Sequence, residues 1–324
     1  MPNAIRFHQT GGPEVLTWEN VELPPPAPGE ATVQHAAMGL NFIDVYHRKG
    51  LYPLALPSGI GMEGAGTVLA VGEGVTEVAV GDRVAYAGMP LGAYAEARNL
   101  PAHRLLKLPD GIGFETGAAM MLQGLTAAYL LRKTYPVKAG DAVLIHAAAG
   151  GVGLIACQWA KALGATVIGT VGSAAKAELA LAHGCDHVID YRAEAFAPKV
   201  RELTGGAGVH VVYDGVGQDT FAGSLDSLRQ MGLMVSYGNA SGPVPAVDLL
   251  QLSQKGSLFI TRPTLMHYTA RREDLVELGQ ALFAEVLAGR VKIEINQRYA
   301  LRDAAQAHRD LEARQTTGST ILVP

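Results

Sequence analysis

The stretch VLIHAAAGGVG, Val143–Gly153, predicts a short apolar β-strand that runs into a glycine-rich turn. The segment Leu154–Leu163 that follows has helical character and stops at Gly164. A strand, a glycine turn and a helix in this order are the context in which a G-x-G-x-x-G pattern indicates dinucleotide binding. The three positions of the pattern are Ala148, Gly150 and Gly153, so alanine replaces the first glycine.

Each small residue of this turn has a physical reason. A small first residue permits the tight turn, Gly150 lets the backbone approach a pyrophosphate, and Gly153 lets the helix sit close to the strand. The helix N-terminus then offers N–H groups to the phosphates. The pattern alone is equally compatible with a plain strand-to-helix turn, and the flanking elements favour a dinucleotide. The predicted phosphate contacts come from four consecutive residues: Ala149, Gly150, Gly151 and Val152.

Repeated strand–helix units follow the glycine turn. Apolar strands are predicted at 166–171, 187–190, 209–214, 232–237 and 257–260, with a helix rich in Ala, Leu, Lys and Glu at 174–183. Strands that alternate with helices imply a parallel, doubly wound sheet with right-handed crossovers, an α/β fold of the Rossmann type.

The residues before this region have a different period. From residue 4 to about 122 the chain consists of short strands between glycine and proline turns, spaced as in a small barrel or sandwich. A long helix at 272–288 precedes two more strands at 296–299 and 320–323, which we expect to rejoin the first domain. The predicted nucleotide-binding domain, 123–262, is therefore inserted in a mostly β domain formed by 1–122 and 263–324.

Composition narrows the class of protein. The 324 residues are 48% hydrophobic and 17% charged with a net charge of −4, which suits a soluble globular enzyme and makes nucleic acid an unexpected partner. No apolar run is long enough to span a membrane, and the N-terminus lacks the apolar core of a signal peptide. The only two cysteines, Cys157 and Cys185, are expected to be buried thiols rather than a disulfide. These features predict a cytoplasmic protein.

The choice of cofactor is decided just beyond the second strand of the sheet. An NAD enzyme usually places Asp or Glu there to bind the ribose 2′-hydroxyl. This chain instead has Gly172, Ser173 and Lys176, a hydroxyl and a cation that suit a 2′-phosphate. Tyr191, just after the third strand, could donate a further hydrogen bond. Helix capping by Ser173 and a solvated Lys176 are the alternative roles. The sequence therefore favours NADPH over NADH.

Several segments together resemble the zinc-free quinone oxidoreductases of the medium-chain dehydrogenase/reductase superfamily, the group that includes zeta-crystallin. The resemblance covers essentially the whole chain. The segments that carry it are 39–46, 59–66, 147–153, 188–191, 212–217, 236–239 and 314–324. It implies a GroES-like catalytic domain around the inserted Rossmann domain.

The departures from the zinc-dependent members of that superfamily are informative. Those relatives have a cysteine ligand where Asn41 stands and a histidine ligand where Met62 stands, and often a four-cysteine structural zinc lobe. Neither Asn41 nor Met62 suits Zn²⁺ in those places, and two cysteines cannot form the lobe. Alcohol dehydrogenation, which needs a Lewis acid, is therefore not expected, and no metal ligands are assigned. For the neighbouring Glu63 a structural or ion-pairing role is expected.

The resemblance also implies the residues around the cofactor. Asn41, Tyr46 and Tyr52 fall where the first domain meets the nicotinamide, and a tyrosine hydroxyl could pass a proton to the substrate; simple packing is the alternative role of each tyrosine. Thr126 is expected to hydrogen-bond the cofactor. Further cofactor contacts are expected beyond strand ends and near the C-terminus, at Gly217, Gly238, Asn239 and Arg314. For Arg314 an ordinary surface position is the alternative.

Two other polar side chains are expected to have no part in the chemistry. Asp44 is expected to be structural. His146 lies on a buried strand, and a hydrogen-bonded core side chain is the expectation for it.

The implied reaction is hydride transfer from NADPH to a quinone bound between the domains. One alternative is an NADPH-dependent 2-alkenal or enone reductase, which differs only in its substrate pocket. Another is a nucleotide-binding, crystallin-like protein with little turnover. The resemblance also suggests a homodimer formed by pairing of the edge strands of the nucleotide domains.

Overall fold

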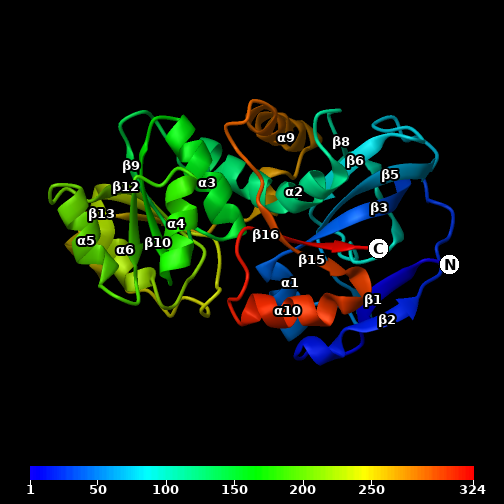
Figure 1. Ribbon diagram of the computed structural model, residues 1–324, viewed down its shortest axis with the longest axis horizontal. Coiled ribbons are helices and arrows are strands. Elements are labelled where there is room, and N and C mark those ends of the chain that lie inside the picture. The colour runs from blue at the N-terminus through cyan, green and yellow to red at the C-terminus, as the bar shows by residue number, and fades with distance from the viewer. The chain divides into compact units, whose positions relative to one another are not determined.

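The computed structural model describes all residues, 1–324, and divides the chain into two compact units (Figure 1). Unit 1 contains Met1–Leu125, Thr269–Leu287 and Ile293–Pro324, and unit 2 contains Thr126–Tyr268 and Ala288–Lys292. The divisions expected from sequence, at 122/123 and 262/263, lie three and six residues before those observed. Helix α2 (Phe114–Tyr129) continues without interruption through both the expected and the observed first division.

Unit 2 is built on a six-stranded parallel sheet with the order β11-β10-β9-β12-β13-β14. This order reverses between β9 and β12, as in a doubly wound Rossmann sheet, which confirms the predicted fold class. The strands are β9 (Ala142–Ile145), β10 (Thr166–Val171), β11 (His187–Asp190), β12 (Val209–Asp214), β13 (Leu228–Ser236) and β14 (Phe259–Thr261).

Helices cover both faces of this sheet. In Figure 1, α3 and α4 lie on one side of the strands and α5 and α6 on the other. The helices of unit 2 are α3 (Gly151–Ala162), α4 (Ala174–Ala182), α5 (Phe196–Leu203), α6 (Phe221–Ser227), α7 (Leu250–Gln254) and α8 (Leu265–Tyr268), and a π-helical turn, Leu130–Thr134, extends α2. Apolar side chains of the strands and of α5 and α6 fill one core, which includes Leu144, Ile168, Val212, Phe221 and Leu225.

Two strands of unit 2 differ from the sequence prediction. β13 begins at Leu228 and not at residue 232, because Leu228 already pairs with Val209 of β12. The register then shifts, so that Val211 pairs with Leu233, and Met231 between the two pairs has a φ of +54°. β14 begins at Phe259 and not at residue 257, because Ser257 has a φ of +56°, which is incompatible with a strand.

Unit 1 is mostly β structure. A seven-stranded sheet has the order β15-β16-β3-β5-β6-β8, with β7 also paired to β3, and a three-stranded sheet has the order β2-β1-β4. β16 pairs antiparallel with β3, so the C-terminal strands rejoin the N-terminal sheet as predicted. The strands are β1 (Asn3–Phe7), β2 (Thr17–Asn20), β3 (Glu30–Leu40), β4 (Ser58–Gly59), β5 (Glu63–Val71), β6 (Arg83–Ala87), β7 (Ala97–Pro101), β8 (Leu106–Lys107), β15 (Ile295–Ala300) and β16 (Ser319–Val323).

Besides α2, three helices belong to unit 1: α1 (Phe42–Lys49), α9 (Arg272–Leu287) and α10 (Ala304–Glu312). α1 begins at the N-cap Asn41 and ends at Gly50, which has a φ of +80°. Short 3₁₀ turns occupy Pro13–Val15, Ala102–Arg104 and Leu301–Asp303. None of the helices in either unit is both long and apolar enough to cross a membrane.

The two tryptophans of the chain have opposite environments. Trp159 on α3 is 1% exposed, whereas Trp18 on β2 is 40% exposed. The two cysteines are both free and buried, with their sulfur atoms 3.4 Å apart, as expected for reduced thiols.

Candidate functional site

The glycine turn follows β9 directly and ends in the first turn of α3. The turn is tight because Ala147 adopts a φ of +52° and its carbonyl accepts the Gly150 N–H at 2.8 Å. A Cβ on Gly153 would lie 2.3 Å from the Ala147 carbonyl oxygen and 2.8 Å from Ala148 Cα, so only glycine lets α3 approach the turn this closely. The role expected of Gly153 is therefore visible in the backbone.

Gly150, the N-cap of α3, is constrained differently. It has an ordinary φ of −84°, and a Cβ there would meet a single atom within 4 Å, the Ala147 oxygen at 3.2 Å. The space in front of Gly150 is thus open to a ligand. The first N–H groups of a helix have no intrahelical acceptor, so Gly151, Val152 and Gly153 begin a helix whose amides can bind phosphate. The residues present fit a dinucleotide pyrophosphate.

The carboxyl ends of β10 and β11 bring together most of the residues expected at a 2′-phosphate. Ser173 is the N-cap of α4, and its hydroxyl accepts the Lys176 backbone N–H at 3.4 Å. A Cβ on Gly172 would lie 2.6 Å from the Tyr191 hydroxyl and 3.4 Å from Arg192 Nε, so both side chains lie against Gly172. Arg192 was not among the residues predicted from sequence, although a cation directly after Tyr191 is a side chain that suits a phosphate.

The turns after β12 and β13 hold Gly217, Gly238 and Asn239 in one place. Gly217 has a φ of +96° and forms a β-bridge with Gly242. A Cβ on Gly238 would lie 2.3 Å from the Gly215 oxygen. These glycines allow the two turns to pack directly on each other at the carboxyl edge of the sheet, where doubly wound folds bind ligands.

A buried carboxylate shapes the first of these turns. Asp214 ends β12 and accepts the N–H groups of Val216 at 2.8 Å and of Gly217 at 3.0 Å, together with the hydroxyls of Thr220 and Ser224. His146, at the end of β9, bonds to Ser224 Oγ at 2.9 Å and to Thr170 Oγ1 at 2.8 Å.

These contacts confirm that His146 is a hydrogen-bonded core side chain. Burial lowers its pKa and keeps the imidazole neutral. The Asp214 network was not foreseen, although an aspartate that ends a buried strand was a usable signal.

The second turn is held by Arg262, another residue that sequence analysis missed. Its Nη1 donates to the Ser236 carbonyl at 2.8 Å. With the Asn239 amide oriented so that its nitrogen donates to the Gly238 carbonyl at 2.9 Å, its oxygen accepts from Arg262 Nη2 at 3.1 Å.

In unit 1, Asn41 belongs to a buried polar network. Its amide nitrogen donates to Glu63 Oε1, and its amide oxygen accepts from Gln123 Nε2 at 3.1 Å. Ser319 Oγ continues the chain to Gln123 Oε1 at 2.7 Å, and Glu63 Oε2 accepts the Leu122 N–H at 2.6 Å. Glu63 is thus hydrogen-bonded to amide groups of this network and not ion-paired. Burial raises the pKa of Glu63 to about 8.

Tyr46 lies on α1, and Tyr52 follows the end of that helix. The rings of Tyr46 and Tyr52 pack edge to face with centroids 5.7 Å apart, and the ring centroids of Phe42 and Tyr46 are 5.6 Å apart. Both tyrosines are partly exposed. Asp44, expected to be structural, accepts the Asn41 backbone N–H and the Tyr94 hydroxyl, each at 2.9 Å.

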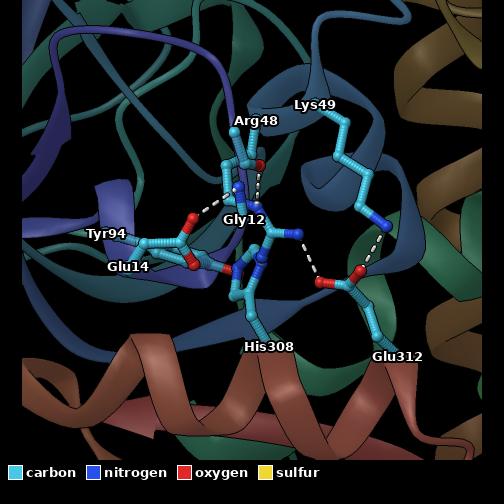
Figure 2. Close-up of polar contacts among 8 residues, drawn as sticks. Gly12, Glu14, Arg48, Lys49, Tyr94, His308 and Glu312 are labelled. Atoms are coloured by element: carbon cyan, nitrogen blue, oxygen red, sulfur yellow. Dashed lines mark hydrogen bonds and ion pairs between the residues drawn. The ribbon is translucent and has the colours of Figure 1, made fainter.

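A fully buried arginine fastens α1 to α10. Arg48 Nε donates to the Gly11 carbonyl at 3.1 Å, Nη1 donates to His308 Nδ1 at 3.0 Å, and Nη2 pairs with Glu312, which also pairs with Lys49 (Figure 2). Since arginine can only donate, His308 Nδ1 must be the acceptor, and the ring is neutral. Burial, and then the charge of Arg48, lower the pKa of His308 to about 3. The helix that carries Tyr46 is therefore fixed by this cluster.

The His308 environment predicts a loss of stability in acid. An unfolded histidine titrates near pH 6.5. Between pH 6.5 and about pH 3, His308 is protonated in the unfolded chain and neutral in the folded chain. The free energy of unfolding therefore falls as the pH is lowered, by about 1.4 kcal/mol per pH unit at most. Urea unfolding at pH 7 and about pH 4.5 should show a smaller acid loss in His308→Gln than in the wild type. His187→Gln, at an exposed histidine, is the control; an equal acid loss in all three proteins would contradict the assignment.

Two further predicted residues are Thr126 and Arg314. Thr126 is on α2. Arg314 is exposed just after α10, with a φ of +59°. Nowhere do three or more His, Cys, Asp or Glu side chains gather as they would to hold a metal ion.

Comparison with known proteins agrees with this architecture. The model "Alcohol dehydrogenase GroES-like domain" matches residues 27–110, and the model "Zinc-binding dehydrogenase" matches residues 151–281. A quinone oxidoreductase of Pseudomonas aeruginosa is 56% identical over the full length of both chains. A 2-haloacrylate reductase of a Burkholderia species is 46% identical, covering 100% of this chain and 99% of its own. A crystal structure of Escherichia coli quinone oxidoreductase complexed with NADPH has a TM-score of 0.98 and 52% identity, over 99% of this chain and 100% of that one.

A GroES-like unit and a Rossmann unit with a glycine turn together define a medium-chain dehydrogenase/reductase. Within that superfamily, the chain belongs to the quinone oxidoreductase family.

Proposed function

We propose that this protein reduces quinones by hydride transfer from NADPH, without a metal ion. The observation that carries the proposal is the full-length similarity of this chain to quinone oxidoreductases, one of which was crystallised with NADPH. The glycine turn of this chain also fits a pyrophosphate. Bound NADPH supplies the hydride. The quinone accepts it with one proton and becomes the hydroquinone.

The residues of unit 2 hold the cofactor in this proposal. The first-turn amides of α3 and the open backbone from Ala149 to Val152 bind the pyrophosphate. Ser173, Lys176 and Tyr191, joined by Arg192, bind the 2′-phosphate through charge-assisted hydrogen bonds. The nicotinamide side of the cofactor is assigned to Thr126, Gly217, Gly238 and Asn239, and a phosphate contact to Arg314.

The residues of unit 1 act on the reacting groups. Asn41 and Tyr46 orient the nicotinamide and the quinone, and Tyr46 or Tyr52 donates the proton that balances the hydride. The support for this assignment is the edge-to-face packing of the two tyrosines, because it brings together two hydroxyl-bearing rings, one of which is on the helix that begins at Asn41.

Turnover tests the proposal. Purified protein should oxidise NADPH in the presence of benzoquinones or naphthoquinones, with kcat/KM for NADPH well above that for NADH. A panel that also contains 2-alkenals, enones and 2-haloacrylate tests the second candidate, which the 46% identical 2-haloacrylate reductase favours. A higher kcat/KM for the activated alkenes than for the quinones would make activated alkenes the substrate class of this protein. NADPH binding without oxidation by any of these acceptors would leave only a nucleotide-binding protein.

We further propose a homodimer in which β14 pairs with its copy. β14 is an edge strand of the sheet, and large apolar side chains near it are exposed: Leu249, Leu250 and Phe259. An open apolar edge is usually covered. A cytoplasmic location is likewise proposed, since two unpaired thiols suit a reducing compartment. Light scattering measures the oligomeric state of the purified protein, and a monomeric mass would refute the homodimer. Cell fractionation tests the cytoplasmic location.

A further inference from the structure

The buried network around Asn41 is complete in two opposite directions. Its four side chains are Asn41, Glu63 on β5, Gln123 on α2 and Ser319 on β16, and none is more than 8% exposed. Gly39 makes room for the carboxyl group, because a Cβ there would lie 2.1 Å from Glu63 Oε1.

In the orientation observed, every donor points toward Glu63. Ser319 Oγ donates to Gln123 Oε1, Gln123 Nε2 donates to Asn41 Oδ1, and Asn41 Nδ2 donates to Glu63 Oε1. The Leu122 N–H also donates to this carboxyl group, at Oε2. Each carboxyl oxygen thus accepts one N–H group, an arrangement that suits the ionised form of Glu63.

The reversed arrangement is equally well satisfied. A protonated Glu63 would donate to Asn41 Oδ1, the rotated Asn41 amide would donate to Gln123 Oε1, and the rotated Gln123 amide would donate to Ser319 Oγ. The Ser319 hydroxyl would then donate to the Ala119 carbonyl, which already lies 3.1 Å away. No atom has to move, because each amide only exchanges its nitrogen and oxygen positions.

We propose that Glu63 is a positioning residue whose protonation state decides whether Asn41 presents an N–H donor or a carbonyl acceptor. With Glu63 ionised, Asn41 Nδ2 uses one N–H on Glu63 and retains the second. With Glu63 protonated, the carbonyl oxygen occupies that position. Burial holds the pKa of Glu63 at about 8, so the exchange falls in an accessible pH range.

The consequence for catalysis rests on the proposed function. Negative charge develops on the quinone oxygen as the hydride arrives, and an N–H donor aimed at it stabilises the transition state. The ionised state of Glu63 is therefore the active state, and activity rises with pH as Glu63 loses its proton.

Other titratable groups lie close to Glu63. The charge of Asp44 contributes to the raised pKa of Glu63, and burial raises the pKa of Asp44 itself to about 7. Tyr86 and Tyr94 also feel the charge of Glu63, and burial raises the pKa of both hydroxyls above the usual value, so they remain protonated. Asp44 is thus the group that a test must separate from Glu63.

Glu63→Gln locks the network in one direction. The Leu122 N–H requires an acceptor, so the oxygen of the introduced amide must face Leu122 and its NH₂ must face Asn41. Asn41 must then present its carbonyl oxygen, as in the protonated wild type. Asp44→Asn is the matched control, because it removes the other titrating carboxyl group and leaves Glu63 in place.

The experiment measures kcat/KM for quinone reduction from about pH 6.5 to 9.5, together with the Kd for NADPH. In the wild type, kcat/KM should rise about tenfold through a midpoint near pH 8, the effect of one hydrogen bond. In Asp44→Asn the same rise should remain with a lower midpoint, because the charge of Asp44 contributes to the raised pKa of Glu63. In Glu63→Gln, kcat/KM should stay at the low plateau, with a Kd for NADPH within about threefold of the wild type, because the α3 turn and the 2′-phosphate site are unchanged. A rise retained in Glu63→Gln, or lost in Asp44→Asn, overturns the proposal.

A second measurement does not depend on turnover. The Asn41 side-chain amide signals in a ¹H–¹⁵N spectrum, assigned by their loss in Asn41→Ser, should shift with pH in the wild type and stay fixed in Glu63→Gln. Signals that do not move in the wild type refute the exchange of orientation. If no quinone is reduced while the signals titrate, the proposed function fails and the role of Glu63 stands.

Discussion

Replacing Ser173 by aspartate and Lys176 by alanine is expected to weaken NADPH binding by roughly 100-fold or more and NADH binding by only a few-fold. The double substitution removes a cation and adds a carboxylate where a 2′-phosphate would bind, while aspartate can hydrogen-bond a ribose hydroxyl. Aspartate is as good an N-cap as serine, so α4 should keep its start. The selectivity of the site should therefore change without loss of the fold.

Fluorescence titration with both nucleotides measures this change in selectivity. Lys199→Ala removes an exposed lysine that pairs with Glu202 elsewhere in the same unit, and it controls for a general loss of positive charge. An equal loss of affinity for NADPH and NADH in the double variant would place the 2′-phosphate elsewhere. A single Arg192→Ala substitution should act in the same direction with a smaller effect, because it leaves Lys176 in place.

Alanine at Gly153 and alanine at Gly150 should have different effects on stability and the same effect on NADPH binding. At Gly153 the new methyl group collides with the backbone of Ala147 and Ala148 and forces α3 away from β9, at a cost of about 1–3 kcal/mol in the free energy of unfolding. At Gly150 it meets one atom at 3.2 Å in an ordinary conformation, so stability should change by less than about 1 kcal/mol.

Both variants should nevertheless bind NADPH at least about tenfold more weakly. Gly153→Ala displaces the helix whose amides face the pyrophosphate, and Gly150→Ala fills the space through which the backbone would be approached. Chemical denaturation and nucleotide titration of the two variants test the contrast. If Gly150→Ala binds NADPH as the wild type does, the pyrophosphate is not at this turn.

The features that could be predicted from sequence are those that depend on neighbouring residues. Strands such as Thr166–Val171 and Val209–Asp214 agree with the structure to the residue, because each is rich in β-branched residues and is followed directly by a glycine. The tight glycine turn between β9 and α3 likewise comes from one short segment with its own chemistry.

The features that sequence analysis missed depend on residues far apart in the chain. Glu63, Gln123 and Ser319 meet at Asn41 only because β5, α2 and β16 pack together, and no spacing in the sequence announces this. Helix α10 was missed for a different reason: it is a short element between two predicted strands, although the alanine-rich run before Leu311 favours a helix.

The different environments of the two tryptophans allow the unfolding of one unit to be followed by intrinsic fluorescence. Trp18 lies on β2 in unit 1. Trp159 is a buried residue of α3 in unit 2, the helix that starts at the glycine turn. In a Trp18→Phe variant all tryptophan emission originates from α3, and a buried indole shifts its emission to the red when water reaches it. The unfolding of the Rossmann unit can thus be followed separately from that of the GroES-like unit, without an attached dye.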